Sequence, residues 1–166
     1  MKRRGTLHAP DDSAPNHARI RRARRADAGA IAGSLYDAFV EYESRYTPGG
    51  FAATTVTAEE ILRRWDEGPV WVAVVNSAIE GTVAAAPRGR SLLVRSMSIV
   101  PATRSLGIGV SLLRSVERFA RKNGFDQLSL TTTHSCFAQF DCTNDSALRG
   151  VDRECSTCSA RRCSRW

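Results

Sequence analysis

The 166-residue sequence lacks long hydrophobic runs, and no apolar stretch approaches the roughly 18 residues that would cross a bilayer. Its first 25 residues are basic but hold no apolar segment of the kind that forms a secretory signal. We therefore expect a cytoplasmic protein that makes no contact with a membrane. Hydrophobic residues at 42% and charged residues at 25% are typical of a soluble globular chain, and the length suits one domain.

Cysteine is missing from the first 135 residues, and all five cysteines lie in the last 31. Disulfides are rare in cytoplasmic proteins, and the pair Cys155 and Cys158 invites a zinc or redox interpretation instead. Its spacing to Cys136, Cys142 and Cys163 matches no common zinc finger or ribbon. We therefore expect no metal site.

The basic residues are unevenly distributed along the chain. Lys and Arg outnumber Asp and Glu by 24 to 17, which gives a net charge of +7. Residues 1–25 hold eight basic and two acidic residues, whereas residues 26–135 hold eleven of each. Residues 1–17 are polar and aperiodic, which predicts a disordered basic arm. Such arms bind nucleic acid or acidic partners, but this one lacks aromatic residues and a DNA-binding motif. A solvated arm is favoured, and no nucleic-acid partner is expected.

The middle of the chain carries the periodicities of helices and strands. Asp27 is the expected N-cap of a helix over 28–46, which the sequence TPGG at 47–50 ends. Thr57 and Glu60 form a capping box for a second helix. Further elements are expected at 18–25 (an edge strand or a charged lead-in), 70–75, 79–86, 91–100 and 127–133 (strands) and 107–123 (an amphipathic helix). This order predicts an α/β sheet with a βαβ crossover.

The loop RSLGIG, from Arg104 to Gly109, lies between a predicted strand and a predicted helix. A helix start offers unpaired backbone N–H groups and the positive end of the macrodipole. Glycine lets the backbone approach an anion closely, and Arg104 adds positive charge, so the loop predicts a phosphate or pyrophosphate site. The spacing fits neither the P-loop nor the Rossmann fingerprint. The alternative is that the glycines serve only the packing of the helix.

The pattern Arg-x-x-Gly-x-Gly, after a strand that ends in an apolar-x-Pro unit at Pro101, resembles motif A of the GCN5-related N-acetyltransferases (GNAT). The resemblance is closest over 91–125 and extends in element order over about 18–135. It implies a GNAT-like acyl-CoA N-acyltransferase fold, in which helices flank a mixed central sheet. The N-acetyltransferase domain would span 18–134.

The same resemblance implies where the donor, acetyl-CoA, would bind. Backbone amides of the loop would hold its pyrophosphate. The loop residues are Arg104, Ser105, Leu106, Gly107, Ile108 and Gly109. The preceding strand would offer backbone groups of Met97, Ser98 and Ile99 to the pantetheine arm, at a bulge where the strand splays from its neighbour.

The sequence departs from the family at the general base. Many members carry a glutamate on the strand before the loop, but the matching stretch, 92–96, reads LLVRS and holds no carboxylate. The attacking amine must still lose a proton. Glu41 and Glu43 on the first helix, a water relay and His134 are the candidates. Each of these three side chains has the alternative of being a solvated surface residue. Ser105 also stands where the family often has glycine.

The tail over 135–166 is rich in Cys, Ser and Arg, and its few large apolar residues show no regular period. In a shifted reading frame, codons for residues 139–148 can encode I-R-L-Y-E-R-F-G-F. That string resembles the A-I-x-L-Y-E-x-x-G-F segment that follows the fourth strand in the family. We therefore expect the tail after about His134 to be out of frame and poorly ordered, and the C-terminal part of the fold to be atypical or incomplete.

The shifted frame has a functional consequence. In the family, the tyrosine of that segment often protonates the departing CoA thiolate, and Cys142-Thr143 stand at that place here. The literal sequence is expected to lack this acid and to leave a sheet edge unpaired.

The resemblance therefore implies an acetyl-CoA-dependent N-acetyltransferase, impaired as written, that acts as a monomer or homodimer. Its acceptor would be an amine of a small molecule or protein. Tyr42, Tyr46 and several carboxylates on the first helices indicate a cationic amine. The alternatives are a catalytically inactive acyl-CoA-binding remnant and a protein that interacts through its basic arm.

Overall fold

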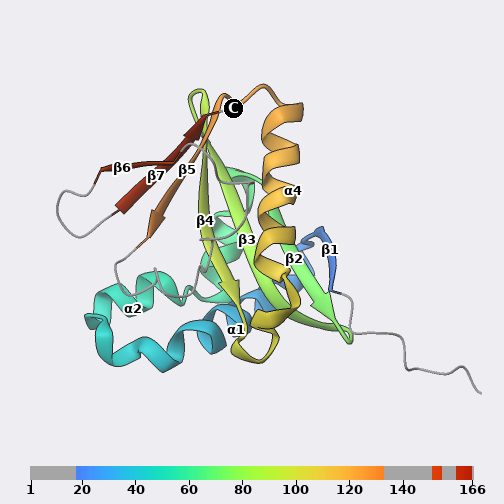
Figure 1. The fold of residues 1–166 in the computed structure, drawn as a ribbon. Helices are drawn as coiled ribbons and strands as arrows, with labels where there is room; N and C mark the ends of the chain where they lie inside the picture. The colour runs from blue at the N-terminus through green and yellow to red at the C-terminus, as the bar shows by residue number, and fades with distance from the viewer. Residues whose placement is uncertain (1–17, 133–150, 155–159, 166) are drawn as a thin grey trace, which may run out of the picture.

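The structure, a computed structural model, describes residues 18–132, 151–154 and 160–165 and is built around a seven-stranded sheet (Figure 1). The strands are β1 (Arg19–Arg22), β2 (Val70–Val75), β3 (Ala78–Arg88), β4 (Ser91–Ile99), β5 (Gln127–Thr132), β6 (Val151–Glu154) and β7 (Ala160–Arg165). Their order is β1-β2-β3-β4-β5-β7-β6, and every neighbouring pair is antiparallel except the parallel pair β4 and β5. The predicted mixed sheet is therefore confirmed.

Helices cover both faces of the sheet. The α-helices are α1 (Ala28–Phe39), α2 (Pro48–Thr54), α3 (Ala58–Arg63) and α4 (Ile108–Lys122). Short 3₁₀ segments are η1 (Arg25–Asp27), η2 (Val40–Arg45), η3 (Trp65–Glu67) and η4 (Pro101–Leu106). The crossover from β4 through α4 to the parallel strand β5 is the predicted βαβ unit.

Two apolar cores follow from the alternation of side chains along the strands. In β2, Trp71, Ala73 and Val75 belong to the core that includes α4, whereas Val72 belongs to the core that includes α1. A strand that is buried on both faces needs a nearly continuous apolar run, and this explains why all six residues of 70–75 are apolar.

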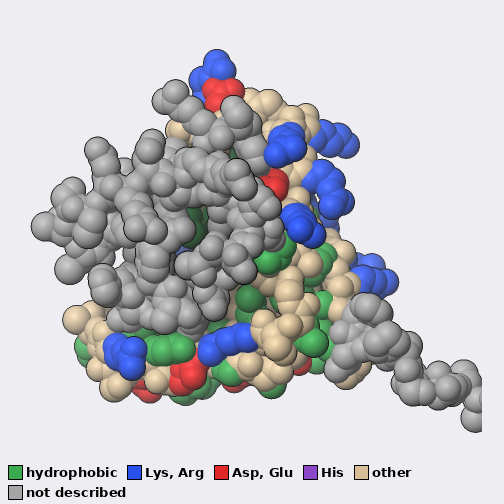
Figure 2. Space-filling model, in the orientation of Figure 1, with side chains coloured by type: hydrophobic (Ala, Val, Ile, Leu, Met, Phe, Trp, Pro, Cys, Tyr) green, Lys and Arg blue, Asp and Glu red, His purple; other side chains and the backbone are tan. Residues whose placement is uncertain are grey.

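The amphipathic pattern of α4 places one apolar stripe against the sheet. Ile108, Leu112, Val116 and Ala120 are fully buried, and Lys and Arg side chains gather over the outer side of this helix (Figure 2). Gly81 of β3 allows the helix to come close, because a Cβ there would lie 3.1 Å from Cγ2 of Ile108. The helix that follows the candidate loop is thus packed closely against the sheet.

The first helix is shorter than the sequence predicted. It ends at Phe39, and η2 continues the chain to Arg45. A break occurs close to the expected place, because Tyr46 and Thr47 are extended, but the sequence did not predict that α2 begins at Pro48. Thr47 Oγ1 accepts a hydrogen bond from the Gly50 N–H at 3.2 Å, and Pro48 occupies the first helical position, where its missing N–H loses nothing. The predicted capping box of Thr57 and Glu60 on α3 is confirmed.

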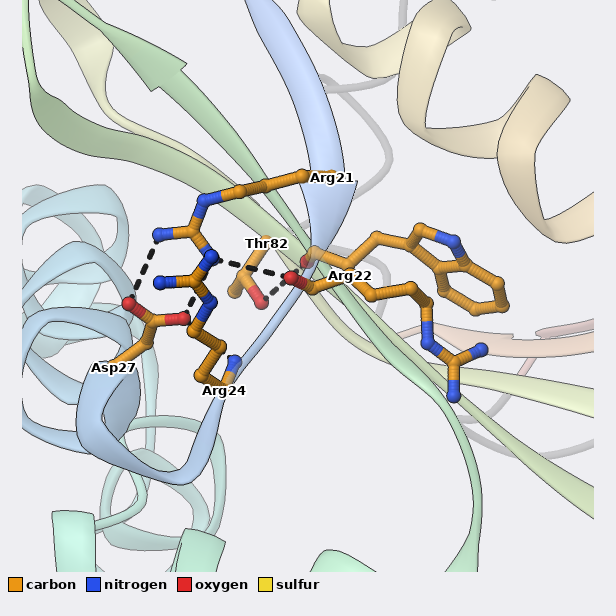
Figure 3. A network of polar contacts seen from close by, with 6 residues as sticks. Arg21, Arg22, Arg24, Asp27 and Thr82 are labelled. Carbon is orange, nitrogen blue, oxygen red and sulfur yellow. Dashed lines mark hydrogen bonds and ion pairs between the residues drawn. The ribbon is translucent and has the colours of Figure 1, made fainter.

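Asp27 occupies the expected N-cap position of α1 but makes no capping hydrogen bond to that helix, because its side chain is engaged elsewhere (Figure 3). Its two carboxylate oxygens accept hydrogen bonds from the guanidinium of Arg21 at 2.7 and 2.9 Å. One of them also accepts from the Arg24 N–H at 2.6 Å. The Arg21 guanidinium, and secondarily the Arg24 N–H, lower the pKa of Asp27. This network ties the end of β1 to the start of α1.

The expectation of an unpaired sheet edge beyond β5 is wrong. β7 pairs antiparallel with β5 from Gln127↔Arg165 to Thr132↔Ala160, and β6 pairs with β7. The basic arm 1–17, His134, and Cys142-Thr143 lie outside the described residues.

Candidate functional site

The two parallel strands part halfway along β4. Their register runs from Ser91↔Gln127 to Val94↔Leu130 and stops there. β4 continues to Ile99, while the last residues of β5 stay paired only with β7. Crevices at the carboxyl ends of parallel strands are the usual place for ligands in α/β sheets.

A bulge in β4 lies just beyond the point of divergence. Thr82 pairs with Ser98, whereas Ala84 pairs with Arg95, so β4 holds one extra residue against β3. Ser96 within it adopts a left-handed conformation, with φ of 48°. Bulges bend a strand and change the direction of its side chains. Here the bulge directs the following residues of β4 away from β5.

The three predicted strand residues direct their side chains into the protein. Met97 is 6% exposed and belongs to the core around α4. The Ser98 hydroxyl lies 3.2 Å from the Ser34 hydroxyl of α1, and both are buried. Ile99 packs against the α4 core. Among the described strands none pairs with the β5 side of β4 beyond Val94, so this segment can offer a ligand its backbone groups.

The loop after β4 ends in a helix start with free amides. Gly107 has φ of 67°, and the first hydrogen bond of α4 runs from the Ser111 N–H to the Gly107 carbonyl at 3.2 Å. The N–H groups of residues 108–110 therefore have no partner within the helix. A Cβ on Gly107 would meet nothing within 4 Å, so open space lies in front of this turn. An anion placed there would meet N–H groups and the positive end of the helix dipole.

The two loop glycines have different roles. Gly107 is required by its positive φ, a conformation that most residues avoid. Gly109 is required by packing, because a Cβ there would lie 2.9 Å from Cδ1 of Ile99. Gly109 therefore has a packing role, which is part of the alternative raised by the sequence. Ser105 and Leu106 are exposed, whereas Ile108 is fully buried.

Arg104 and Glu41, predicted for different roles, contact each other. Arg104 donates hydrogen bonds to Glu41 Oε1 at 2.5 Å and to the carbonyl oxygen of Ala38 at 3.2 Å. The Glu41 carboxylate is thus occupied by the guanidinium of the loop. A proton acceptor in catalysis must instead face the attacking amine.

Glu43 is exposed and borders a hollow of about 550 Å³ between η2, α2 and α3. Tyr46 and Phe51 line the same hollow, and their ring centroids lie 6.2 Å apart in an edge-to-face arrangement. Glu60 also lines it. Tyr42 lies apart from this lining, under the guanidinium of Arg45 at 5.6 Å.

Sequence reasoning missed a carboxylate at the divergence of the strands. Leu92 and Val94 belong to the α4 core, so Arg95 points to the opposite face of the sheet. There its guanidinium forms an ion pair with Glu67 of η3, with side chains 23% and 41% exposed. The stretch 92–96 lacks a carboxylate, but the fold supplies one from 28 residues earlier. No spacing in the sequence signals this contact.

Within the described residues, no cluster of three or more His, Cys, Asp or Glu side chains is arranged to hold a metal ion. The helices in the described part of the chain are too short or too polar to cross a membrane.

Solved structures of acetyltransferases share this fold. PaiA N-acetyltransferase from Thermoplasma acidophilum, in complex with coenzyme A, aligns with a TM-score of 0.74 and 14% identity over 90% of this chain and 99% of its own. A GNAT family acetyltransferase from Brucella melitensis, in complex with acetyl-CoA, aligns with a TM-score of 0.65 and 19% identity over 91% and 89% of the two chains. The GNAT domain of S. lividans PAT gives 0.71 and 15% over 90% of each.

Comparison with curated proteins finds no match. The sequence profile of the acetyltransferase (GNAT) family matches residues 35–139, which is more than half of the chain. The match includes the divergence of β4 and β5, the bulge and the loop before α4. The chain therefore belongs to the GNAT family of acetyltransferases.

Proposed function

We propose that this protein transfers the acetyl group of acetyl-CoA to an amine of a small molecule or of a protein, in the cytoplasm. The observation that carries the proposal is the left-handed Gly107, open to solvent at a helix start that packs, through Gly109, against Ile99 in the part of β4 that no longer pairs with β5. Family membership supports the reaction class. Two structural relatives are described in complex with coenzyme A and with acetyl-CoA, which supports the donor.

The donor would be held mainly by backbone groups. The pyrophosphate would accept hydrogen bonds from the N–H groups of 108–110, in the loop that runs from Arg104 to Gly109. The pantetheine arm would lie along β4 at residues 97–99, where the strand has left β5 and the side chains face inward. Such binding would depend on the path of the backbone and little on the identity of the loop side chains.

The transfer itself needs one base and one acid. The amine nitrogen attacks the thioester carbonyl carbon, its proton passes to a base, the C–S bond breaks, and the CoA thiolate takes up a proton. We assign the base to Glu43, since Glu41 is bound to Arg104. Glu67, beside Arg95, is the competing carboxylate, and a water relay and His134 are the remaining alternatives.

The helical layer favours a positively charged acceptor. Residues 28–67 contain seven acidic and three basic residues. Their summed field raises the local concentration of cations. Glu43 borders the hollow beside two aromatic rings, an arrangement that suits an ammonium group on an apolar stem. Glu60 in the same lining is paired with Arg63, and Arg64 also borders the hollow. We therefore propose an acceptor with at least one positive charge.

Thermal unfolding with acetyl-CoA and coenzyme A tests donor binding, because a ligand that binds only the folded state raises Tm. We expect a rise with both ligands, and NAD serves as a control dinucleotide. No rise at saturating acetyl-CoA would overturn the proposal. Release of free thiol is then measured with linear diamines, a lysine-containing peptide and, as matched controls, amino acids with acidic side chains. Release with the cationic amines supports the enzyme.

The second candidate is a catalytically inactive acyl-CoA-binding protein. It is favoured by the Cys142-Thr143 sequence at the place of the family's tyrosine. A rise in Tm without thiol release from any amine would support it over the enzyme.

A further inference from the structure

Arg104 connects the donor loop to the end of the first helix. Its guanidinium donates hydrogen bonds to two oxygen atoms of that region, the Ala38 carbonyl of α1 and the Glu41 carboxylate of η2. These partners lie 66 and 63 residues earlier in the sequence. Arg104 is 29% and Glu41 42% exposed, so the pair is partly shielded from solvent. Charge-assisted hydrogen bonds of this kind are short and directional.

The contact lies where the loop has few other restraints. At the start of η4, Thr103 is fixed to Val100 through both its N–H and its hydroxyl, at 3.0 and 3.1 Å. After Arg104 come two exposed residues, Ser105 and Leu106, and then the left-handed Gly107. Arg104 is thus the last side chain tied to the body of the protein before the turn that begins α4.

The Glu41 carboxylate compensates the charge of Arg104, and this limits what Arg104 can contribute to anion binding. With a carboxylate 2.5 Å away, the positive charge of Arg104 is largely compensated before any anion arrives. Its contribution to pyrophosphate binding is then chiefly geometric, because it fixes the path of the loop and so the direction of the free amides. Binding sites work best when their donors are already oriented.

We infer that Glu41 is a positioning residue for donor binding, which holds Arg104 and thereby the loop, and that it is not the general base. The inference rests on the proposed function of this loop. It also links the two substrates, because η2 carries Glu43 on the rim of the acceptor-side hollow. A shift of the loop would reach this rim through the ion pair.

The variants Glu41→Ala and Glu41→Gln test the inference in the full chain. Asp37→Asn is the matched control, since it removes one negative charge from an exposed position of the neighbouring helix α1, four residues before Glu41 of η2. Without any ligand, hydrogen exchange of the amides at 104–110 should be faster in Glu41→Ala and unchanged in Asp37→Asn. Unchanged exchange in Glu41→Ala would overturn the inference whatever the protein binds.

Calorimetric titration with coenzyme A gives the second measurement. Loss of a charged hydrogen bond predicts a Kd about tenfold higher in Glu41→Ala. Glu41→Gln keeps an oxygen acceptor and should lie between Glu41→Ala and the parent. With a cationic amine as acceptor, KM for acetyl-CoA should rise in parallel with Kd. The value of kcat should stay within about twofold of the parent's, and the shape of its pH profile should not change.

Two opposite outcomes would overturn the inference. A large fall in kcat with an unchanged Kd would make Glu41 the base. A lower Kd would show that Glu41 competes with the pyrophosphate for Arg104. If Glu41→Ala fails to fold, Glu41→Gln carries the same comparison. Failure of the parent protein to bind coenzyme A would overturn the proposed function, and loop exchange would still test the positioning role.

Discussion

Glu67 of η3 forms an ion pair with Arg95 of β4 on the face of the sheet opposite α4, at the first residue beyond the pairing of β4 with β5 and directly before the bulge. A carboxylate thus reaches the position where the strand itself carries none. Glu43, on the rim of the hollow, is the carboxylate of the helical layer that we assign as the base. Their pairing differs, because Glu67 already has a cationic partner.

We predict that Glu43→Gln lowers kcat/KM by about 10²- to 10⁴-fold, the usual contribution of a general base. Glu67→Gln should instead change mainly KM for the amine. Both are measured with steady-state kinetics from pH 5 to 9, with the exposed Glu59→Gln as the control. If Glu67→Gln lowers kcat/KM by this factor and Glu43→Gln does not, the base is Glu67.

The Asp27 network predicts a pH-dependent stability. The pKa of Asp27 is lowered in the folded state by hydrogen bonds from Arg21 and Arg24. Its contribution is therefore complete above the unfolded pKa of about 3.9 and is lost as the pH falls through the folded value. Asp27→Asn should lower the free energy of unfolding at pH 7 by about 1.5–3 kcal/mol, as for hydrogen bonds to charged groups.

Urea unfolding at pH 7 and at steps from pH 5 to pH 2 measures this effect. The difference between Asp27→Asn and the parent should shrink toward the acid end. Asp66→Asn is the matched control, because Asp66 is 93% exposed and lies 3.9 Å from Arg25. Exposed pairs of this kind contribute little. An equal loss in both variants would contradict the prediction.

The two loop glycines should respond differently to alanine. Gly107→Ala forces a side chain into a left-handed conformation and should destabilise the fold by about 1–2 kcal/mol. Gly109→Ala places a Cβ against Cδ1 of Ile99 and should displace the helix start from β4. We expect the second variant to weaken coenzyme A binding by displacing the free amides.

The double variant Gly109→Ala with Ile99→Val removes the atom that clashes and should recover most of the affinity. Gly33→Ala, at an exposed position of α1 where a Cβ meets nothing, should stabilise the helix by about 0.5–1 kcal/mol and leave binding unchanged. Affinity is measured by calorimetry and stability by thermal unfolding. No recovery in the double variant would show that Gly109 acts otherwise than by packing against Ile99.

We further propose that residues after about His134 are read out of frame. Sequencing the encoding DNA should reveal a missing or extra base near that codon. A protein with the frame restored should gain activity, because it regains the tyrosine of the family segment, while its affinity for coenzyme A should change less. A DNA sequence that encodes the five cysteines without interruption in independent isolates would contradict this proposal.

Local signals were sufficient wherever one periodicity dominated. The stripe of α4, the doubly buried run of β2 and the capping box at Thr57 predicted their elements correctly. The loop from Arg104 to Gly109 was placed correctly between β4 and α4 for the same reason. Backbone hydrogen bonding and side-chain alternation within a short segment decide these features, and the sequence contains both.

Local signals failed where a residue had two possible partners. The sequence TPGG ends a helix or begins one, and here Thr47 and Pro48 begin α2. Asp27 is a residue type that commonly caps helices, but its carboxylate instead accepts two hydrogen bonds from the Arg21 guanidinium. Such choices depend on which partner the packed elements bring within reach.

By itself the sequence determined the order of the elements from α3 to β5, the burial of α4 and the chemistry of a helix start after β4. Only the tertiary structure decided that Glu41 holds Arg104, that Glu67 reaches Arg95, and that β7 covers the edge of β5. The physical reason is distance along the chain. Helix and turn formation is settled within a few residues, whereas ion pairs and strand pairing between remote segments form only after the whole sheet and its helices have packed.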